Sequence, residues 1–84
     1  MAVAPTIGGL LGERVRELRK KRGLTQVEFA ALCGVPQSRI STIENGSRVP
    51  NVETVLRLAH ALDCKVTTLM SVFDKGDLSS LLPN

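Results

Sequence analysis

Residues 37 to 42 carry the most varied hydrogen-bonding side chains of the chain. Glutamine and arginine can each grip the edge of a DNA base with two hydrogen bonds, and serine or threonine can donate to a base, accept from it or touch a thymine methyl. An ordinary solvated helix face would more often carry Lys, Glu and Ala, which favour helix more strongly. The pattern therefore predicts a surface that reads base pairs in the major groove, made by Gln37, Ser38, Arg39, Ser41 and Thr42.

The chain contains few residues that could catalyse a reaction or bind a metal. His60 is the only histidine, and Cys33 and Cys64 lie far apart, without the close spacing of a metal site or a redox motif. No neighbour of either cysteine indicates a lowered thiol pKa. We therefore expect no enzyme, no catalytic residue, no cofactor and no bound metal, and we interpret both cysteines as reduced thiols of a cytoplasmic protein.

Positive charge is concentrated in the first half of the chain. Residues 13 to 48 hold eight Lys or Arg against four acids, a net charge of +4, whereas residues 49 to 84 hold three against four, a net charge of −1. Such asymmetry points weakly to a polyanionic partner, although charge also simply solvates helix surfaces. The first twelve residues are uncharged but contain Pro5, Gly8 and Gly9, so we expect neither a signal peptide nor a membrane span.

The periodicity of apolar residues predicts helices that would position residues 37 to 42. Leu11, Val15 and Leu18 recur at helical spacing in a segment that Gly23 ends. A second helix is predicted to begin at Thr25, because a hydroxyl followed three residues later by Glu28 is the signature of a capping box.

The second helix is expected to end at Gly34, and a third to begin at Pro36 and run to Asn45. Only two residues separate these helices. A connection that short holds two helices at a steep angle, which presents the outer face of the second one. Ile40 and Ile43 would then face the core, leaving residues 38, 42 and 45 outside.

The second half of the chain predicts two more helices and an apolar tail. Asn51 is a good cap for a fourth helix, whose apolar stripe would hold Val52, Val55, Leu56, Ala59 and Leu62. Residues 66 to 73 have helical spacing, but residues 65 to 73 are also rich in β-branched side chains and could form a strand in a dimer. The 84 residues are expected to form one domain, with a core at about 10–73, an N-terminal arm at 1–9 and a C-terminal tail at 74–84.

The segment over residues 24–62 resembles the helix-turn-helix of the Cro and phage-repressor (XRE-type) family. The resemblance rests on Leu-Thr-Gln at 24–26, Ala30, Cys-Gly-Val at 33–35 and Ile-Glu-Asn-Gly at 43–46. It implies an all-α, compact five-helix lambda-repressor-like DNA-binding domain. One departure is Pro36, which stands where the family usually has a capping serine or threonine, so the start of the third helix and the reach of Gln37 are expected to differ.

The family resemblance also implies roles for individual residues. Gln37, Ser38 and Thr42 would face bases, and Arg39 would reach a base or a phosphate. Arg19 and Glu44 match positions that form a buried, structural ion pair in family members. The residues expected on the DNA backbone are Gln26, at the N-terminus of the second helix, and Asn45, Ser47 and Arg48.

These roles predict a homodimeric repressor on a palindromic operator of double-stranded DNA. One small module neutralises few phosphates, so adequate affinity requires two copies about one helical turn apart. An antitoxin that also binds a toxin protein is the main alternative, and a strand at 65–73 would favour it. A protein-interaction adaptor without DNA contact would have an acidic or apolar recognition surface, which Gln37, Arg39 and Arg48 contradict. Candidates for the dimer contact are Leu69, Phe73, Leu78, Leu81 and Leu82.

Overall fold

Six α-helices follow one another in the computed structural model, which describes residues 6–73 and 75–82. No strand occurs in these two ranges. None of the helices they contain is both long enough and apolar enough to cross a membrane. The helices are α1 (Ile7–Lys21), α2 (Gln26–Cys33), α3 (Gln37–Glu44), α4 (Val52–Ala61), α5 (Val66–Met70) and α6 (Lys75–Leu81).

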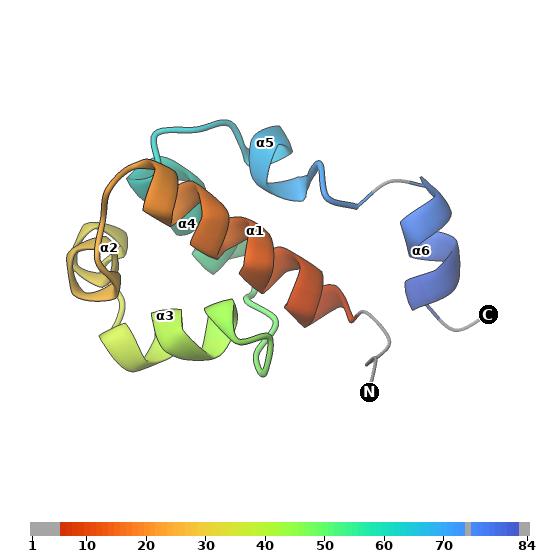
Figure 1. The fold of residues 1–84 in the computed structure, drawn as a ribbon, viewed down its shortest axis with the longest axis horizontal. Helices are drawn as coiled ribbons and strands as arrows, with labels where there is room; N and C mark the ends of the chain where they lie inside the picture. The colour runs from red at the N-terminus through yellow and green to blue at the C-terminus, as the bar shows by residue number, and fades with distance from the viewer. Residues whose placement is uncertain (1–5, 74, 83–84) are drawn as a thin grey trace.

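The first helix, α1, runs through the middle of the molecule and contacts α3 and α5 (Figure 1). The short helix α2 packs against both α3 and α4, and α4 also contacts α5. The last helix, α6, lies at the opposite end of the molecule from α2 (Figure 1). The helix-turn-helix unit of α2 and α3 is thus supported from two sides, by α1 and by α4.

The core between these helices is aliphatic except for one aromatic ring. Phe29 of α2 is completely buried and belongs to a core cluster with side chains from α1, α3, α4 and α5. Fully burying side chains of this size is worth about 1.5–3 kcal/mol each relative to exposure. The other large and fully buried residues are Val15, Ile40, Ile43, Leu58, Leu62 and Leu69.

The start of α1 differs from the expected N-terminal arm at residues 1–9, because the helix already begins at Ile7. The hydroxyl of Thr6 accepts a hydrogen bond of 2.9 Å from the backbone N–H of Gly9, which caps the helix. Gly8 and Gly12 then lie one turn apart on the face toward α3. A Cβ at Gly8 would come within 2.6 Å of the Gly46 carbonyl oxygen, and one at Gly12 would clash with backbone oxygens of α3. The missing side chains let the two helix backbones approach.

The caps of α2 agree with the sequence, whereas α3 begins one residue later than expected. Thr25 and Glu28 form both hydrogen bonds of the capping box, and Gly34 ends α2 at φ +72°. Pro36 is the residue before α3 rather than its first residue. Its extended conformation, ψ 147°, keeps it outside the helix, and its side chain offers no cap.

The apolar stripe predicted for α4 is rotated relative to the observed one. Asn51 caps the helix as expected, accepting a hydrogen bond of 2.8 Å from the N–H of Thr54. Leu58, absent from the predicted stripe, is completely buried, while Val52 is 76% exposed and Leu56 is 51% exposed. Ala59 and Leu62 of the predicted stripe are buried and Val55 packs against the core, so the prediction is wrong at Val52 and Leu56 and misses Leu58.

Residues 66–70 form helix α5, which decides between the helix and the strand left open by the sequence. Leu69 lies inside the core with no exposed surface, so it is wrong as a candidate for the dimer contact. Phe73 is half-buried against the core. In α6, Leu81 is half-buried, and Leu78 is exposed, as is Leu82 just beyond the helix.

Candidate nucleic-acid interface

The exposed face of α3 carries the polar residues that the sequence singled out. Ile40 and Ile43 are completely buried and fix the rotation of the helix about its axis. Gln37, Ser38 and Arg39 are exposed at its N-terminal end. This end of α3 is therefore open to a ligand.

Two further hydroxyls of α3 are less accessible. Ser41 and Thr42 are both half-buried. The Thr42 hydroxyl donates a hydrogen bond of 2.9 Å to the carbonyl oxygen of Arg39, one turn earlier. Its donor is thus occupied within the helix, and its remaining lone pair and its methyl group are what it can offer a ligand.

A shallow hollow of about 160 Å³ lies on the same face of the molecule. Arg39 and Arg48, which are nine positions apart in sequence, both line it. Two positive charges beside two hydroxyls suit an anion or the acceptor edge of a base. The hollow is lined by Pro36, Ser38, Arg39, Thr42 and Arg48.

The turn after α3 places the predicted backbone-contacting residues. The side-chain oxygen of Asn45 accepts a hydrogen bond of 2.9 Å from the N–H of Ser47, and the Thr42 carbonyl oxygen accepts one of 3.2 Å from the N–H of Arg48. Gly46 sits between them at φ +83°, a conformation that glycine adopts without strain. Asn45, Ser47 and Arg48 are all exposed.

A buried ion pair joins α1 to the C-terminal end of α3. Arg19 donates two hydrogen bonds to Glu44, of 2.6 Å from Nε and 3.0 Å from Nη2. The side chain of Glu44 has no exposed surface, and Arg16 approaches it at 3.5 Å from the solvent side. Arg19 also donates to the Leu24 carbonyl oxygen at 2.7 Å, so it ties the turn between α1 and α2 to the same network.

The ionisation of this pair follows from its hydrogen bonds. Burial raises the pKa of Glu44, but the hydrogen bonds from Arg19 and Gln26 and the charge of Arg19 lower it by more, so the pKa of Glu44 lies below its usual range. The hydrogen bond to Glu44 likewise raises the pKa of Arg19. Both groups are therefore charged at neutral pH.

Gln26 connects the ion pair to the exposed end of α3, which the sequence did not predict. Its side-chain nitrogen donates to Glu44 at 3.1 Å, and its side-chain oxygen accepts a hydrogen bond of 2.8 Å from the nitrogen of Gln37. The two glutamines are eleven residues apart on different helices. The steep crossing of α2 and α3 brings their first turns together. The only signal in the sequence for this contact is that each of these two helices begins with a glutamine.

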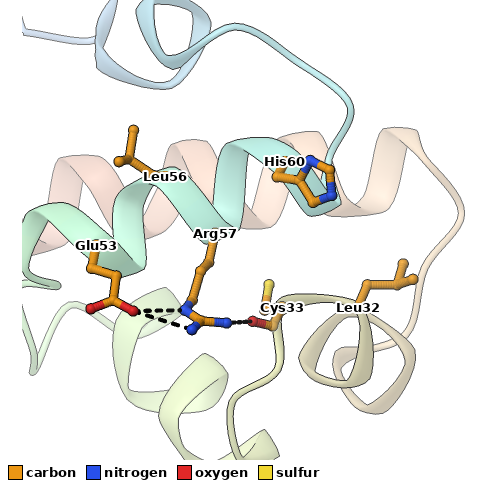
Figure 2. Close-up of a pocket in the computed structure, with 6 residues that line it drawn as sticks. All are labelled: Leu32, Cys33, Glu53, Leu56, Arg57 and His60. Atoms are coloured by element: carbon orange, nitrogen blue, oxygen red, sulfur yellow. Dashed lines mark hydrogen bonds and ion pairs between the residues drawn. The ribbon is translucent and has the colours of Figure 1, made fainter.

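A larger hollow, of about 320 Å³, lies between α2 and α4 (Figure 2). Arg57 spans it, donating to the Glu53 carboxylate at 3.1 Å and to the Cys33 carbonyl oxygen at 3.3 Å. Burial raises the pKa of the Cys33 thiol to about 11 against the opposing charge of Arg57, so the thiol stays protonated at neutral pH. His60 is exposed at the rim (Figure 2). This hollow holds no activated nucleophile.

Comparison with known proteins gives a consistent set of matches. The HTH_3 family, described as helix-turn-helix, matches residues 15–69. The repressor protein C2 of Salmonella phage P22 is 40% identical over 70 residues, which are 83% of this chain and 31% of that protein. An HTH-type transcriptional regulator of Sinorhizobium fredii, y4dJ, is 38% identical over 66 residues, 79% of this chain and 86% of that protein.

A solved structure extends the comparison to three dimensions. The P22 c2 repressor in complex with a synthetic operator superimposes with a TM-score of 0.66 at 37% identity. The match covers 70% of this chain and 89% of that chain. The likeness therefore extends over most of the DNA-bound protein of that complex.

Proposed function

This chain belongs to the HTH_3 helix-turn-helix family of DNA-binding transcriptional regulators, and we propose that it is a homodimeric repressor that binds a palindromic operator. The observation that carries the proposal is the exposed face of α3 together with the turn after it, where Arg39 and Arg48 line a hollow with Ser38 and Thr42 and Gln37 is exposed beside them. An α-helix fits into the major groove, where these side chains meet base edges. The net charge of +4 over residues 13–48 attracts the phosphates.

We assign base reading to the N-terminal end of α3 and phosphate contacts to its surroundings. Gln37, Ser38 and Arg39 lie where the recognition helix of such a motif meets base edges. Ser41 and Thr42 are half-buried and contribute from further along the helix. The phosphate contacts fall to groups on either side, which are the half-buried Gln26 and the exposed Asn45, Ser47 and Arg48.

The dimer contact is assigned to an apolar groove of about 270 Å³ between α1, α4 and α5. Its lining is apolar throughout, and Val52 at 76% exposure and Leu56 at 51% are unusually accessible for their type. A second copy is the occupant we propose, because a two-fold contact buries the same apolar patch on both chains and supplies one α3 for each half of a palindromic site. The lining includes Val49, Val52, Leu56, Val66, Met70 and Phe73.

Of the candidates chosen from sequence for this contact, Phe73 lines the groove, whereas Leu78, Leu81 and Leu82 lie in or just after α6. We keep these three leucines as a secondary part of the proposed interface. The antitoxin alternative gains no support from residues 66–70, because they form a helix instead of a strand. A regulator of this kind acts where the DNA is, so we expect it in the cytoplasm.

Selection of bound duplexes from a random pool, combined with sedimentation of the same protein preparation, tests the proposal. We expect an enriched sequence with two symmetric halves about one helical turn apart, and a particle with twice the mass of the chain. Enrichment of an asymmetric site by a monomer would refute the dimer. Absence of any enriched sequence would refute base reading itself.

A further inference from the structure

We propose that Arg16 of α1 binds a phosphate of the operator backbone beside the start of α2. The DNA-binding surface would then include the first helix as well as α2, α3 and the turn after α3. The inference rests on the proposed function, since it adds a contact to the same DNA-binding face. The ligand of Arg16 is one phosphate diester of duplex DNA.

Arg16 and Arg19 share a single carboxylate, that of Glu44. In each of the other ion pairs of the described residues, one arginine faces one carboxylate. Two guanidinium groups against one carboxylate leave a net charge of +1 where α1 meets the end of α3. This excess charge is available to an anion from outside the protein.

Glu44 is already satisfied without Arg16. Its carboxylate accepts hydrogen bonds of 2.6 and 3.0 Å from Arg19 and one of 3.1 Å from Gln26. The Nε of Arg16 lies 3.5 Å from Oε1 of Glu44, which is longer than a good hydrogen bond. Of the hydrogen bonds that lower the pKa of Glu44, the one from Arg16 has the smallest influence. The excess charge therefore belongs to Arg16.

The guanidinium group of Arg16 keeps most of its donors for a ligand. Its side chain is 48% exposed, whereas that of Arg19 is 10% exposed. Only its Nε faces Glu44, and within the described residues its two terminal nitrogens donate no hydrogen bond. A guanidinium group with two free N–H groups on one edge matches two oxygens of a phosphate.

The position of Arg16 relative to Gln26 places this group on the DNA-binding face. Oε1 of Glu44 is the atom that both Arg16 and Gln26 contact. Gln26 was assigned a phosphate contact, but its side chain is neutral and half-buried. Its oxygen accepts from Gln37, and one of its amide hydrogens is donated to Glu44. One N–H of Gln26 is left for a phosphate, so Arg16 must supply the charge.

The test variant is Arg16→Gln, which removes the charge and retains an amide that can donate to Glu44. Arg22→Gln is the matched control. Arg22 lies just after α1, its side chain is also 48% exposed, and it contacts Asp63 at the turn after α4. Both variants lower the net charge of the chain equally, so a difference between them reports the position of the charge.

The first measurement is the affinity for a selected and a scrambled duplex at several salt concentrations. We expect Arg16→Gln to bind both duplexes about tenfold more weakly and to lower the slope of log K against log salt by about one. A phosphate contact carries no sequence information, so the loss should be equal for the two duplexes. Arg22→Gln should change affinity by about twofold or less and leave the slope unchanged. Arg16→Lys should keep the wild-type slope.

The second measurement identifies the phosphate. Single phosphates of the selected duplex are replaced in turn by uncharged methylphosphonates. We expect one position in each half-site at which the replacement weakens wild type about tenfold and Arg16→Gln by about twofold or less. If Arg16 only supported Glu44, each replacement would weaken both proteins by the same factor. Urea titration verifies that every variant is folded.

Two results would overturn the inference and leave the proposed function in place. They are a salt slope that is the same in wild type, Arg16→Gln and Arg22→Gln, and a set of methylphosphonate effects that is the same in wild type and Arg16→Gln. A wild-type protein that enriches no sequence from a random duplex pool would instead refute the proposed function. That outcome is seen before any variant is made.

Discussion

The polar face of α3 and the apolar groove beside α4 are both exposed, but the structure holds them in different ways. Behind the α3 face lies a chain of directional hydrogen bonds, from Arg19 through Glu44 and Gln26 to Gln37. Apolar contacts with the core support the groove, whose rim includes the exposed Val52 and Leu56. A surface that distinguishes bases needs fixed donors and acceptors, whereas a surface that joins two copies needs apolar area.

Removing the Glu44 carboxylate should have the largest effect of the changes considered, because the hydrogen-bonded network behind the α3 face depends on it and the apolar groove does not. Glu44→Ala leaves Arg19 charged and unpaired in a buried site, so we expect a loss of about 3–5 kcal/mol in the free energy of unfolding. Urea titration measures it. Glu53→Ala, which breaks an exposed pair with Arg57, is the matched control and should cost about 1 kcal/mol or less. Equal losses would contradict the burial argument.

Acid should weaken the same network more gradually. The pKa of Glu44 is lower in the folded chain than in the unfolded chain, where a glutamate has a pKa of about 4.3. Its contribution is therefore complete above that range and is lost as pH falls toward the folded value. Unfolding curves measured from pH 6 downward should show this decline. The Arg19→Met, Glu44→Leu variant should decline less steeply, and a parallel decline would assign the effect to other carboxyls.

Charging the groove should affect association and leave the fold intact. Val52→Asp places a carboxylate on the apolar lining, and we expect the dimer dissociation constant to rise by about tenfold or more. Sedimentation equilibrium measures the change. Val27→Asp is the control, since Val27 is 67% exposed on α2 and does not line the groove. An unchanged dimer in Val52→Asp would move the interface elsewhere, with α6 as the next place to test.

The smallest effect is expected from a single phosphate contact. Arg48→Ala should weaken binding to all duplexes alike and reduce the slope of log K against log salt by about one. Titrations of a selected and a scrambled duplex at several salt concentrations check both parts. Gln37→Ala is the complementary variant, since it should relax the choice of base with little change in the slope. A sequence-dependent loss in Arg48→Ala would show that this arginine reads a base.

Local signals in the sequence predicted the helices well, because caps and turns are decided by a few neighbouring residues. The capping box at Thr25 and the left-handed Gly34 are examples. The contacts between helices were harder to predict, since they depend on which residues distant in sequence the fold brings close together. Nothing local shows that Gly12 lets α1 approach α3, or that Gln26 meets Gln37.

Surface and core were also confused where apolar residues surround a helix. Leu69 was predicted to lie in the dimer contact but is inside the core, and Val52 was predicted to lie on the buried stripe of α4 but is exposed. Composition cannot separate these cases, because the same side chain suits either environment. The exposed face of α3 was easier to identify, since its residues are polar and the opposite side is isoleucine.

One carboxylate receives hydrogen bonds from α1 and α2 while belonging to α3. Neither α1 nor α3 can swing away by itself without stranding a charge in the interior, and α2 would lose the hydrogen bond from Gln26 to Glu44. The recognition helix is consequently held in its final orientation before any operator arrives, and little conformational entropy is lost on docking. The rate of operator capture should then be governed by diffusion and long-range attraction, with no slow ordering step in between.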